Sequence, residues 1–111
     1  MKKIIYYPSA HKNIQCFSDK AKQRIMRLLE MLSEELDLHP NDFKYMPTVG
    51  TGAYELRVKA DKQYRVFYVV KFTEAIYVLH AFVKKTQETS KHDIDKGKER
   101  YKKLLEHRNG R

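Results

Sequence analysis

Three consecutive runs rich in Val, Tyr, Phe and Ile constrain the fold of this chain more than any other feature. The runs are Tyr54–Lys59, Tyr64–Phe72 and Ile76–Lys84, and only three or four mostly polar residues separate each run from the next. Runs of this length and composition, joined by loops this short, are typical of β-hairpins. The sequence therefore predicts a three-stranded antiparallel meander.

Side chains of a β-strand alternate between two faces, so each run can be divided into two sets. One set is apolar and predicts the core face: Leu56, Val58, Val66, Tyr68, Val70, Leu79, Ala81 and Val83. The other set mixes cations with aromatic rings: Glu55, Arg57, Lys59, Arg65, Phe67, Val69, His80, Phe82 and Lys84. This second face is either the ordinary solvated side of an antiparallel sheet or a binding surface. Exposed rings beside cations favour a nucleic acid strand, whose bases stack on rings while its phosphates pair with cations.

The segment before the meander predicts one strand and two helices. Lys3–Tyr7 is a short apolar run that ends at a proline, as a first strand would. A short helix over Ser9–Phe17 and a longer one over Ser18–Leu38 each begin at a serine suited to cap them. The apolar residues of the longer helix recur at helical spacing, which predicts a helical hairpin on the core face of the sheet.

The remaining segments predict a long loop and a last helix. His39–Ala53 contains two prolines and two glycines and is expected to be irregular. The last helix is capped by Ser90 or Thr89, and Gly97 within it is expected to weaken it. The predicted fold is α+β in the order β-α-α-β-β-β-α, with the helical hairpin packed on one face of an antiparallel sheet.

Charge and composition limit the partners and cofactors. The 111 residues suffice for one domain, and 23 Lys and Arg against 14 Asp and Glu give a net charge of +9. This basic balance favours an anionic partner such as nucleic acid. No apolar run approaches the ~18 residues of a membrane span and no signal-peptide pattern follows Met1, so we expect a cytoplasmic protein without a membrane partner. No His or Cys pair has metal-ligand spacing, so no metal or other cofactor is expected.

The strings ELR, YRVFY and LHAFVKK occur in that order behind the helical hairpin. In this arrangement the chain resembles the RelE superfamily of toxins, and most closely its HigB-like, phage-related branch. The resemblance covers nearly the whole chain and implies a RelE-like fold. It also implies a toxin of a toxin–antitoxin pair that cleaves messenger RNA in the decoding site of the small ribosomal subunit. The implied partners are messenger RNA, the ribosome and an antitoxin protein from the same operon, and the free toxin is expected to be a monomer.

The cleavage implied by the resemblance is an attack of a 2′-hydroxyl on the adjacent phosphate. Such a reaction needs a base, an acid and cations that stabilise the charge on phosphorus. Arg65 matches the arginine of the YR motif and is the predicted phosphate clamp, because guanidinium binds two phosphate oxygens at once. Arg57 and Lys84 complete the positive site. On an open face, replacing Arg65 is expected to leave the fold intact.

The proton carriers are less well defined by the resemblance. His80 is the predicted carrier because its side chain lies on the cationic face, although it is equally suited to a hydrogen bond inside the sheet. His92 and Tyr101 are held as alternatives. The residues expected to bind RNA around the site are Lys85, Lys59, Phe67 and Phe82.

Two other functions compete with cleavage. One is a toxin like the ParE relatives, which share the fold and inhibit DNA gyrase without cutting nucleic acid. The other is an RNA-binding module without catalysis, favoured if the cationic face has no proton carrier within reach. For the antitoxin, we expect an interface on the helical hairpin rather than on the cationic face, because HigB-like relatives often leave the active face open in the complex.

Overall fold

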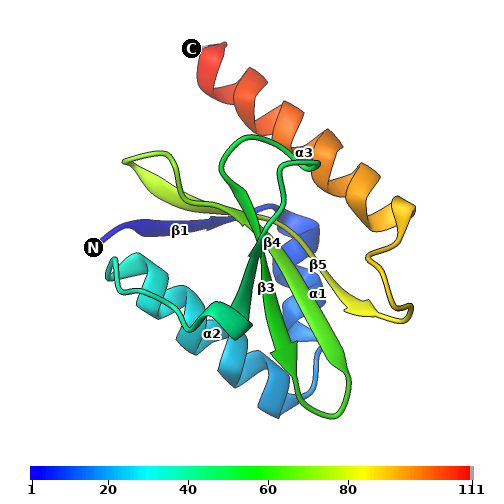
Figure 1. Ribbon diagram of the computed structural model, residues 1–111. Coiled ribbons are helices and arrows are strands. Elements are labelled where there is room, and N and C mark those ends of the chain that lie inside the picture. The colour runs from blue at the N-terminus through cyan, green and yellow to red at the C-terminus, as the bar shows by residue number, and fades with distance from the viewer. Residues whose placement is uncertain (111) are drawn as a thin grey trace.

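A computed structural model describes residues 1–110, which form three α-helices and a five-stranded sheet (Figure 1). In chain order the elements are β1 (Lys3–Tyr6), α1 (Pro8–Gln15), α2 (Asp19–Ser33), the 3-10 turn η1 (Pro40–Asp42), β2 (Phe43–Tyr45), β3 (Ala53–Lys59), β4 (Gln63–Val69), β5 (Ala75–Lys84) and α3 (Lys91–Asn109). The strands lie across the sheet in the order β1-β5-β4-β3-β2. The predicted α+β class is confirmed, and the meander β3-β4-β5 forms the centre of the sheet.

Two features of the sheet differ from the antiparallel arrangement that the sequence predicts. Strand β1 pairs in parallel with β5, with Ile4 opposite Ile76, so the sheet is mixed. Strand β2 pairs with β3 inside the stretch expected to be a loop. Neither feature is encoded locally. A four-residue apolar run does not specify the direction of its partner, and a three-residue strand is too short to show alternation.

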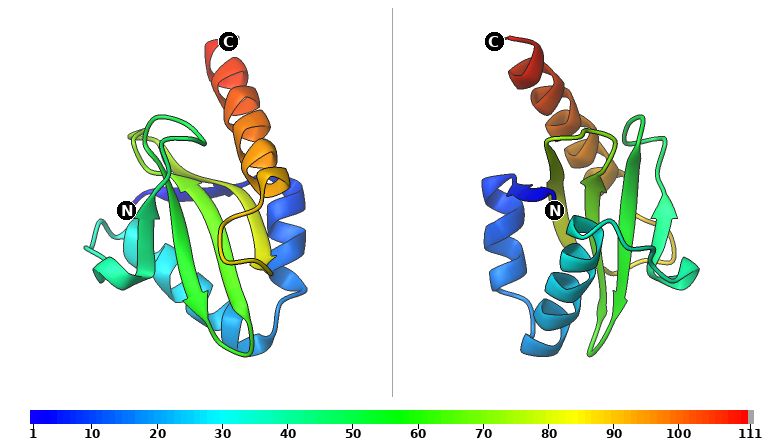
Figure 2. Two further views of the ribbon diagram at one scale, coloured as in Figure 1. Left: turned by 45° about the vertical axis from the view of Figure 1, so that its right-hand side comes forward. Right: turned by 90° about the vertical axis from the view of Figure 1, so that its left-hand side faces the viewer.

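Helices α1 and α2 cover one face of the sheet, as their apolar positions predict (Figure 2). Leu28 and Leu29 of α2 are at most 1% exposed and belong to the same buried cluster as Leu56 of β3. The predicted cap of α2 is confirmed, since Ser18 Oγ accepts a hydrogen bond from the backbone N–H of Ala21 at 3.3 Å. The helical hairpin and the meander therefore share one core.

Helix α3 covers part of the opposite face, so the expectation that this face is open is wrong there (Figure 2). Phe67 is 0% exposed and Phe82 is 8% exposed, and both belong to a second buried cluster that includes Tyr101 of α3. Gly97 makes this close approach possible, because an added Cβ would lie only 2.8 Å from Cδ2 of Phe67. The glycine thus allows α3 to pack on the sheet, which outweighs its poor helix propensity.

A β-bulge in β5 changes which side chains face which layer. Phe67 lies opposite His80, but the next residue, Tyr68, lies opposite Val78, which leaves Leu79 without a cross-strand partner. Leu79 consequently belongs to the cluster under α3 and not to the core face to which strict alternation assigns it. An extra residue in one strand interrupts the two-residue period, which pattern reading assumes to be continuous.

We expect Gly97→Ala to destabilise the protein, although alanine is the better helix former by about 1 kcal/mol. The new methyl group would meet the fully buried ring of Phe67, and overpacking of this kind costs about 1–3 kcal/mol. Urea unfolding of the variant measures the difference. Lys98→Ala, at an exposed position next in the helix, is the matched control. A gain in stability for Gly97→Ala would contradict the close packing.

Candidate functional site

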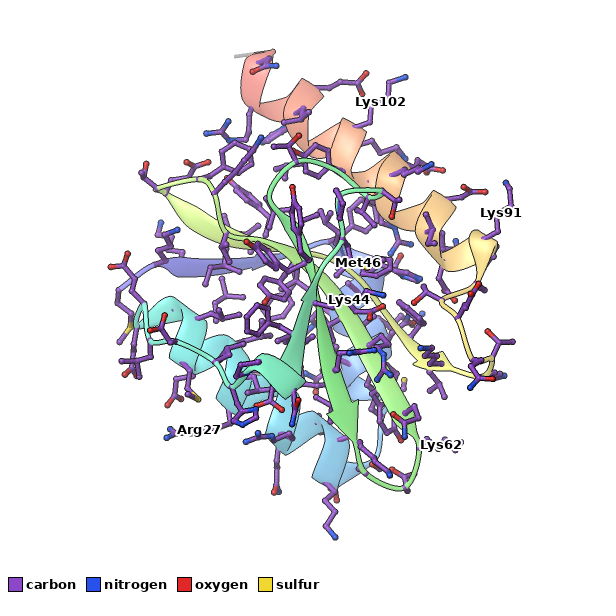
Figure 3. The ribbon with its side chains drawn as sticks, in the orientation of Figure 1. Arg27, Lys44, Met46, Lys62, Lys91 and Lys102 are labelled. Atoms are coloured by element: carbon purple, nitrogen blue, oxygen red, sulfur yellow. The ribbon has the colours of Figure 1, made fainter. Side chains whose placement is uncertain are left out.

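Four cations from four neighbouring strands meet beside the part of the sheet that α3 covers. They are Lys44 of β2, Arg57 of β3, Arg65 of β4 and Lys84 of β5, and they are called the cationic cluster below. The strand register brings them together, since Arg57 lies directly opposite Arg65, and Lys44 lies opposite Glu55. Figure 3 shows Lys44 in front of the central strands. The structure thus brings together Arg57, Arg65 and Lys84, as alternation predicts.

Glu55 is the only carboxylate among the second-face residues of the meander, and it lies within the cationic cluster. Its side chain is 2% exposed, and its Oε1 lies 3.6 Å from Nε of Arg65 and 3.8 Å from Nε of Arg57. Its other oxygen accepts a hydrogen bond from the hydroxyl of Thr89 at 3.0 Å. The sequence reading assigned Glu55 no role. Its position as the one acidic residue on a cationic strand face was the available signal.

Arg65 is buried and incompletely paired. It is 6% exposed, and its Nη1 donates a hydrogen bond to the carbonyl of Tyr64 at 3.0 Å. Among residues 1–110, its Nε is the one buried side-chain nitrogen or oxygen without a hydrogen-bond partner. Burial lowers the pKa of Arg65, and the charge of Glu55 partly opposes that shift. An unpaired buried donor is costly, so an incoming anion at this position would be stabilised.

Lys84 lies at the end of β5 and lines a cleft on the same side of the sheet. The pKa of Lys84 is lowered, first by burial and then by the positive charge of Arg65. The cleft has a volume of about 400 Å³, and its lining includes Lys44, Glu55, Arg57, Lys84 and Thr89. Lys84 therefore releases its proton more readily than a free lysine, in a hollow that also contains the carboxylate.

His80 lies in the same row of the sheet as Glu55, with Phe67 between them, and both of its ring nitrogens are engaged within the protein. Its Nε2 donates to Oδ1 of Asp93 at 2.7 Å, and its Nδ1 accepts from Nη1 of Arg100 at 3.2 Å. The residue is 4% exposed, and burial lowers the pKa of His80 despite the opposing charge of Asp93. These bonds connect the sheet to α3, so they favour the interpretation of His80 as a hydrogen-bonding residue within the fold over its interpretation as a proton carrier.

The aromatic rings expected to stack on RNA bases are not accessible. Phe67 and Phe82 are buried and pack against one another with ring centroids 5.2 Å apart. Their predicted base-stacking role is wrong, because the bulge and α3 enclose this part of the face. Tyr101 is also buried and donates its hydroxyl proton to the carbonyl of Thr51 at 2.6 Å. The alternative carrier His92 is exposed on α3.

The two lysines predicted to bind RNA lie at the same end of the sheet, because Lys59 pairs with Gln63 and Gln63 pairs with Lys84, which precedes Lys85. Lys59 ends β3 and Lys85 follows β5, and both are exposed. Within residues 1–110, no group of three or more His, Cys, Asp or Glu side chains is placed to hold a metal ion. In the same part of the chain, no helix is long and apolar enough to cross a membrane.

Comparison with known proteins adds a family and a fold. A family model described as phage-derived protein Gp49-like matches residues 12–102. Among solved structures, the chain is similar to the Escherichia coli toxin RelE in its free state, in a mutant with two arginines replaced by alanine. That match has a TM-score of 0.58 and 16% identity and covers 96% of each chain. A search of curated proteins found no match. At this level of identity the structural likeness is one of fold.

Proposed function

The chain belongs to the Gp49-like family of phage-derived proteins, a group of RelE- and HigB-like toxins, and on this premise we propose that it is a toxin that cleaves messenger RNA on the ribosome. The family match spans residues 12–102 and so includes the whole cationic cluster. In this proposal the scissile phosphate binds between Arg57, Arg65 and Lys84. The net charge of +9 suits a partner made of RNA.

The observation that carries the proposal is an excess of positive charge with an unmet hydrogen-bond donor. Glu55 supplies one negative charge to Arg57, Arg65 and the nearby Lys84, and Nε of Arg65 has no hydrogen-bond acceptor. A phosphate group would supply oxygen acceptors to the guanidinium groups and offset the repulsion between them. A site built only for stability would balance its charges, so this imbalance favours an anionic ligand.

The cluster also contains groups suited to the proton transfers. Glu55 can accept the proton of the 2′-hydroxyl as the oxygen attacks phosphorus, which forms the new O–P bond. Arg57 and Arg65 stabilise the added negative charge on the phosphoryl oxygens. As the bond to the 5′-oxygen breaks, Lys84 can donate the proton that the leaving oxygen needs, since its pKa is lowered. The products are a 2′,3′-cyclic phosphate and a free 5′-hydroxyl.

Primer extension on cellular messenger RNA after brief induction tests the proposal directly. We expect new 5′ ends within translated regions, and the same cuts on purified ribosomes programmed with a message. Because the proposed proton carriers are side chains, cleavage should persist in EDTA when monovalent salt and polyamine keep the ribosomes assembled. Intact messages during full growth arrest would refute cleavage, and loss of cutting on intact ribosomes in EDTA would refute the metal-free chemistry.

One observation favours a non-catalytic RNA-binding module as the second candidate. Glu55 is already paired with Arg57 and Arg65, and no histidine lies in the cationic cluster. Glu55→Gln separates the two functions, because it removes the proton acceptor and keeps the side-chain shape. Catalysis requires that this variant bind RNA at least as tightly as wild type and fail to cut it. A variant that still arrests growth without cutting RNA supports the module.

For the antitoxin, we propose an interface on α1 and α2 that leaves the cationic cluster uncovered. Met26 on α2 and Leu36 just beyond it are 40% and 50% exposed and offer apolar contact area on this side of the protein. Hydrogen exchange should show protection over residues 8–36 in the complex, and the affinity should depend weakly on salt. Protection confined to residues 54–85, with strong salt dependence, would place the antitoxin on the cationic cluster instead.

A further inference from the structure

A larger hollow adjoins the cleft on the other side of Arg57. It has a volume of about 1000 Å³ and lies between α2, the η1 turn and the hairpin that joins β3 to β4. Its lining includes Lys20, Arg24, Arg57, Lys59, Asp61 and Arg65, and it is called the α2–hairpin groove below. Arg57 lines both this groove and the cleft, so the two hollows meet at the cationic cluster.

The groove carries more positive charge than its internal ion pairs use. Asp42 takes up the charge of Arg24, with the two side chains 3.1 Å apart. Asp61 accepts hydrogen bonds from Ser18, at 2.8 Å, and from Tyr64, and these donors hold the pKa of Asp61 below its usual value.

Two lysines of the groove are available to a ligand. In the part of the chain that the structure describes, neither Lys20 nor Lys59 forms an ion pair, and both are exposed. Arg65 lines the groove as well, and its Nε is the buried donor without an acceptor. A ligand that fits must therefore be an extended anion that begins at the cationic cluster and passes both lysines.

We propose that the α2–hairpin groove binds the single-stranded RNA segment next to the scissile phosphate, with Lys20 and Lys59 each pairing with a backbone phosphate. The inference rests on the proposed function, because the strand continues from the cleft past Arg57. No aromatic side chain lines the groove among residues 1–110, so bases have no ring to stack on there. Recognition is of the phosphate backbone and tolerates any base sequence in this segment.

The test compares two variants that lose the same charge. One is Lys20→Gln/Lys59→Gln, and the control is Lys98→Gln/Lys102→Gln, which removes two exposed lysines of α3. Figure 3 shows Lys102 on α3, far from the hairpin tip marked by Lys62. The probe is a fluorescent 12-nucleotide RNA with every 2′-oxygen methylated, which cannot be cut by 2′-hydroxyl attack. Anisotropy titrations between 50 and 200 mM KCl give the affinity and its salt dependence.

Affinity falls as salt rises, and we expect this dependence to be weaker in the groove variant. The slope of log affinity against log salt should become less negative by about 1.4, because each of the two lost phosphate contacts contributes about 0.7. Its affinity at 50 mM KCl should fall about tenfold, while the control variant changes by less than threefold. Equal losses in the two variants would mean that only net charge matters, which overturns the inference. Absence of wild-type binding at 50 mM KCl overturns it too. So does displacement of the RNA by polyglutamate at an equal concentration of negative charge, because the groove would then bind any polyanion.

A second measurement keeps this inference separate from the proposed function. If cleavage of messenger RNA is lost on substitution of Arg65 and yet is unchanged in Lys20→Gln/Lys59→Gln, that result would support cleavage and refute RNA binding in the groove. A groove-dependent salt slope in a protein that cuts no message would uphold the groove and refute cleavage. On ribosomes programmed with a message that carries a 2′-O-methyl group at the mapped cut site, 4-thiouridine placed at successive positions should label the groove from one side of that site only. Labelling from both sides would contradict a directed strand.

Discussion

Arg65→Ala should abolish RNA cleavage and destabilise the fold at the same time. A solvent-exposed substitution costs within about 0.5 kcal/mol, which is the expectation for an open strand face. Arg65 is instead 6% exposed and faces the buried carboxylate of Glu55 at 3.6 Å. Removing one partner of a buried ion pair costs up to about 3–5 kcal/mol, and we expect the lower part of that range because Glu55 keeps Arg57 and Thr89 as partners. The open face on which the expectation of an intact fold rests is absent at Arg65, so we now expect a less stable variant.

Arg65→Lys separates the chemical role of the residue from its structural role. Lysine keeps the positive charge beside Glu55 but cannot bind two phosphate oxygens with a rigid fork of donors. We expect the free energy of unfolding to change by about 1 kcal/mol or less, and the cleavage rate to fall about 100- to 1000-fold, as for loss of a preorganised donor. Arg27→Lys, at an exposed arginine of α2, is the control. Cleavage at the wild-type rate by a folded Arg65→Lys protein would exclude Arg65 as the phosphate clamp.

Arg100→Ala should weaken the attachment of α3 to the sheet. Arg100 is 8% exposed, donates to the carbonyl of Leu79 at 3.0 Å and to Nδ1 of His80, and lies 4.4 Å from the ring centroid of Tyr7. The substitution leaves two buried acceptors without donors, and we expect a loss of about 3 kcal/mol in the free energy of unfolding. Lys102→Ala, an exposed change on the same helix, is the control in urea unfolding.

The same contacts give the stability a defined pH dependence. Burial is the main cause of the lowered pKa of His80; Asp93 opposes it, while Arg100 and Lys96 add to it. As the pH falls below about 6.5, the unfolded chain takes up a proton that the folded protein does not, so stability decreases. Arg100→Ala removes one charge that lowers the pKa of His80, so the decrease should be smaller in the variant.

Urea unfolding at pH 7.5 and 5.5 measures this difference for the wild type and for Arg100→Ala. Carboxylates with lowered pKa values, such as Glu74 at about 2, lose their contribution only at lower pH. They do not interfere in this interval. An equal decrease in the two proteins would contradict the contact between Arg100 and His80.

The parts of the fold that the sequence predicts are those with a local signal. Alternation identifies the three strands of the meander, and Ser18 and Ser90 cap their helices through side-chain hydrogen bonds. The packing of α3 has a weaker signal. Its buried residues are Gly97, Arg100 and Tyr101, and only Tyr101, together with the partly buried Leu104 and Leu105, belongs to an apolar stripe. Hydrophobic periodicity therefore indicates a short stripe on this helix, but not the buried glycine and arginine beside it.

The candidate site likewise has a part that the sequence predicts and a part that it does not. Arg57 and Arg65 are adjacent because strands in register place alternate residues on one face, and that is predictable from the sequence. The bulge at Leu79 and the cover provided by α3 depend on contacts between distant segments. They engage both ring nitrogens of His80 within the protein and bury Phe67. Alternation thus predicts which cationic side chains lie together, but it does not predict what surrounds them.

The direct pairing of Arg57 with Arg65 places stability and the proposed activity in conflict. Like charges opposite one another in a sheet reduce stability, and Glu55 offsets only part of that cost. Replacing Arg57 by threonine would relieve the repulsion and keep the strand, and in the proposed function it would also remove a phosphate contact. A library screened for heat resistance alone would therefore enrich inactive variants at this position. Under the proposed function, selection for stability and selection for activity therefore act in opposite directions at Arg57.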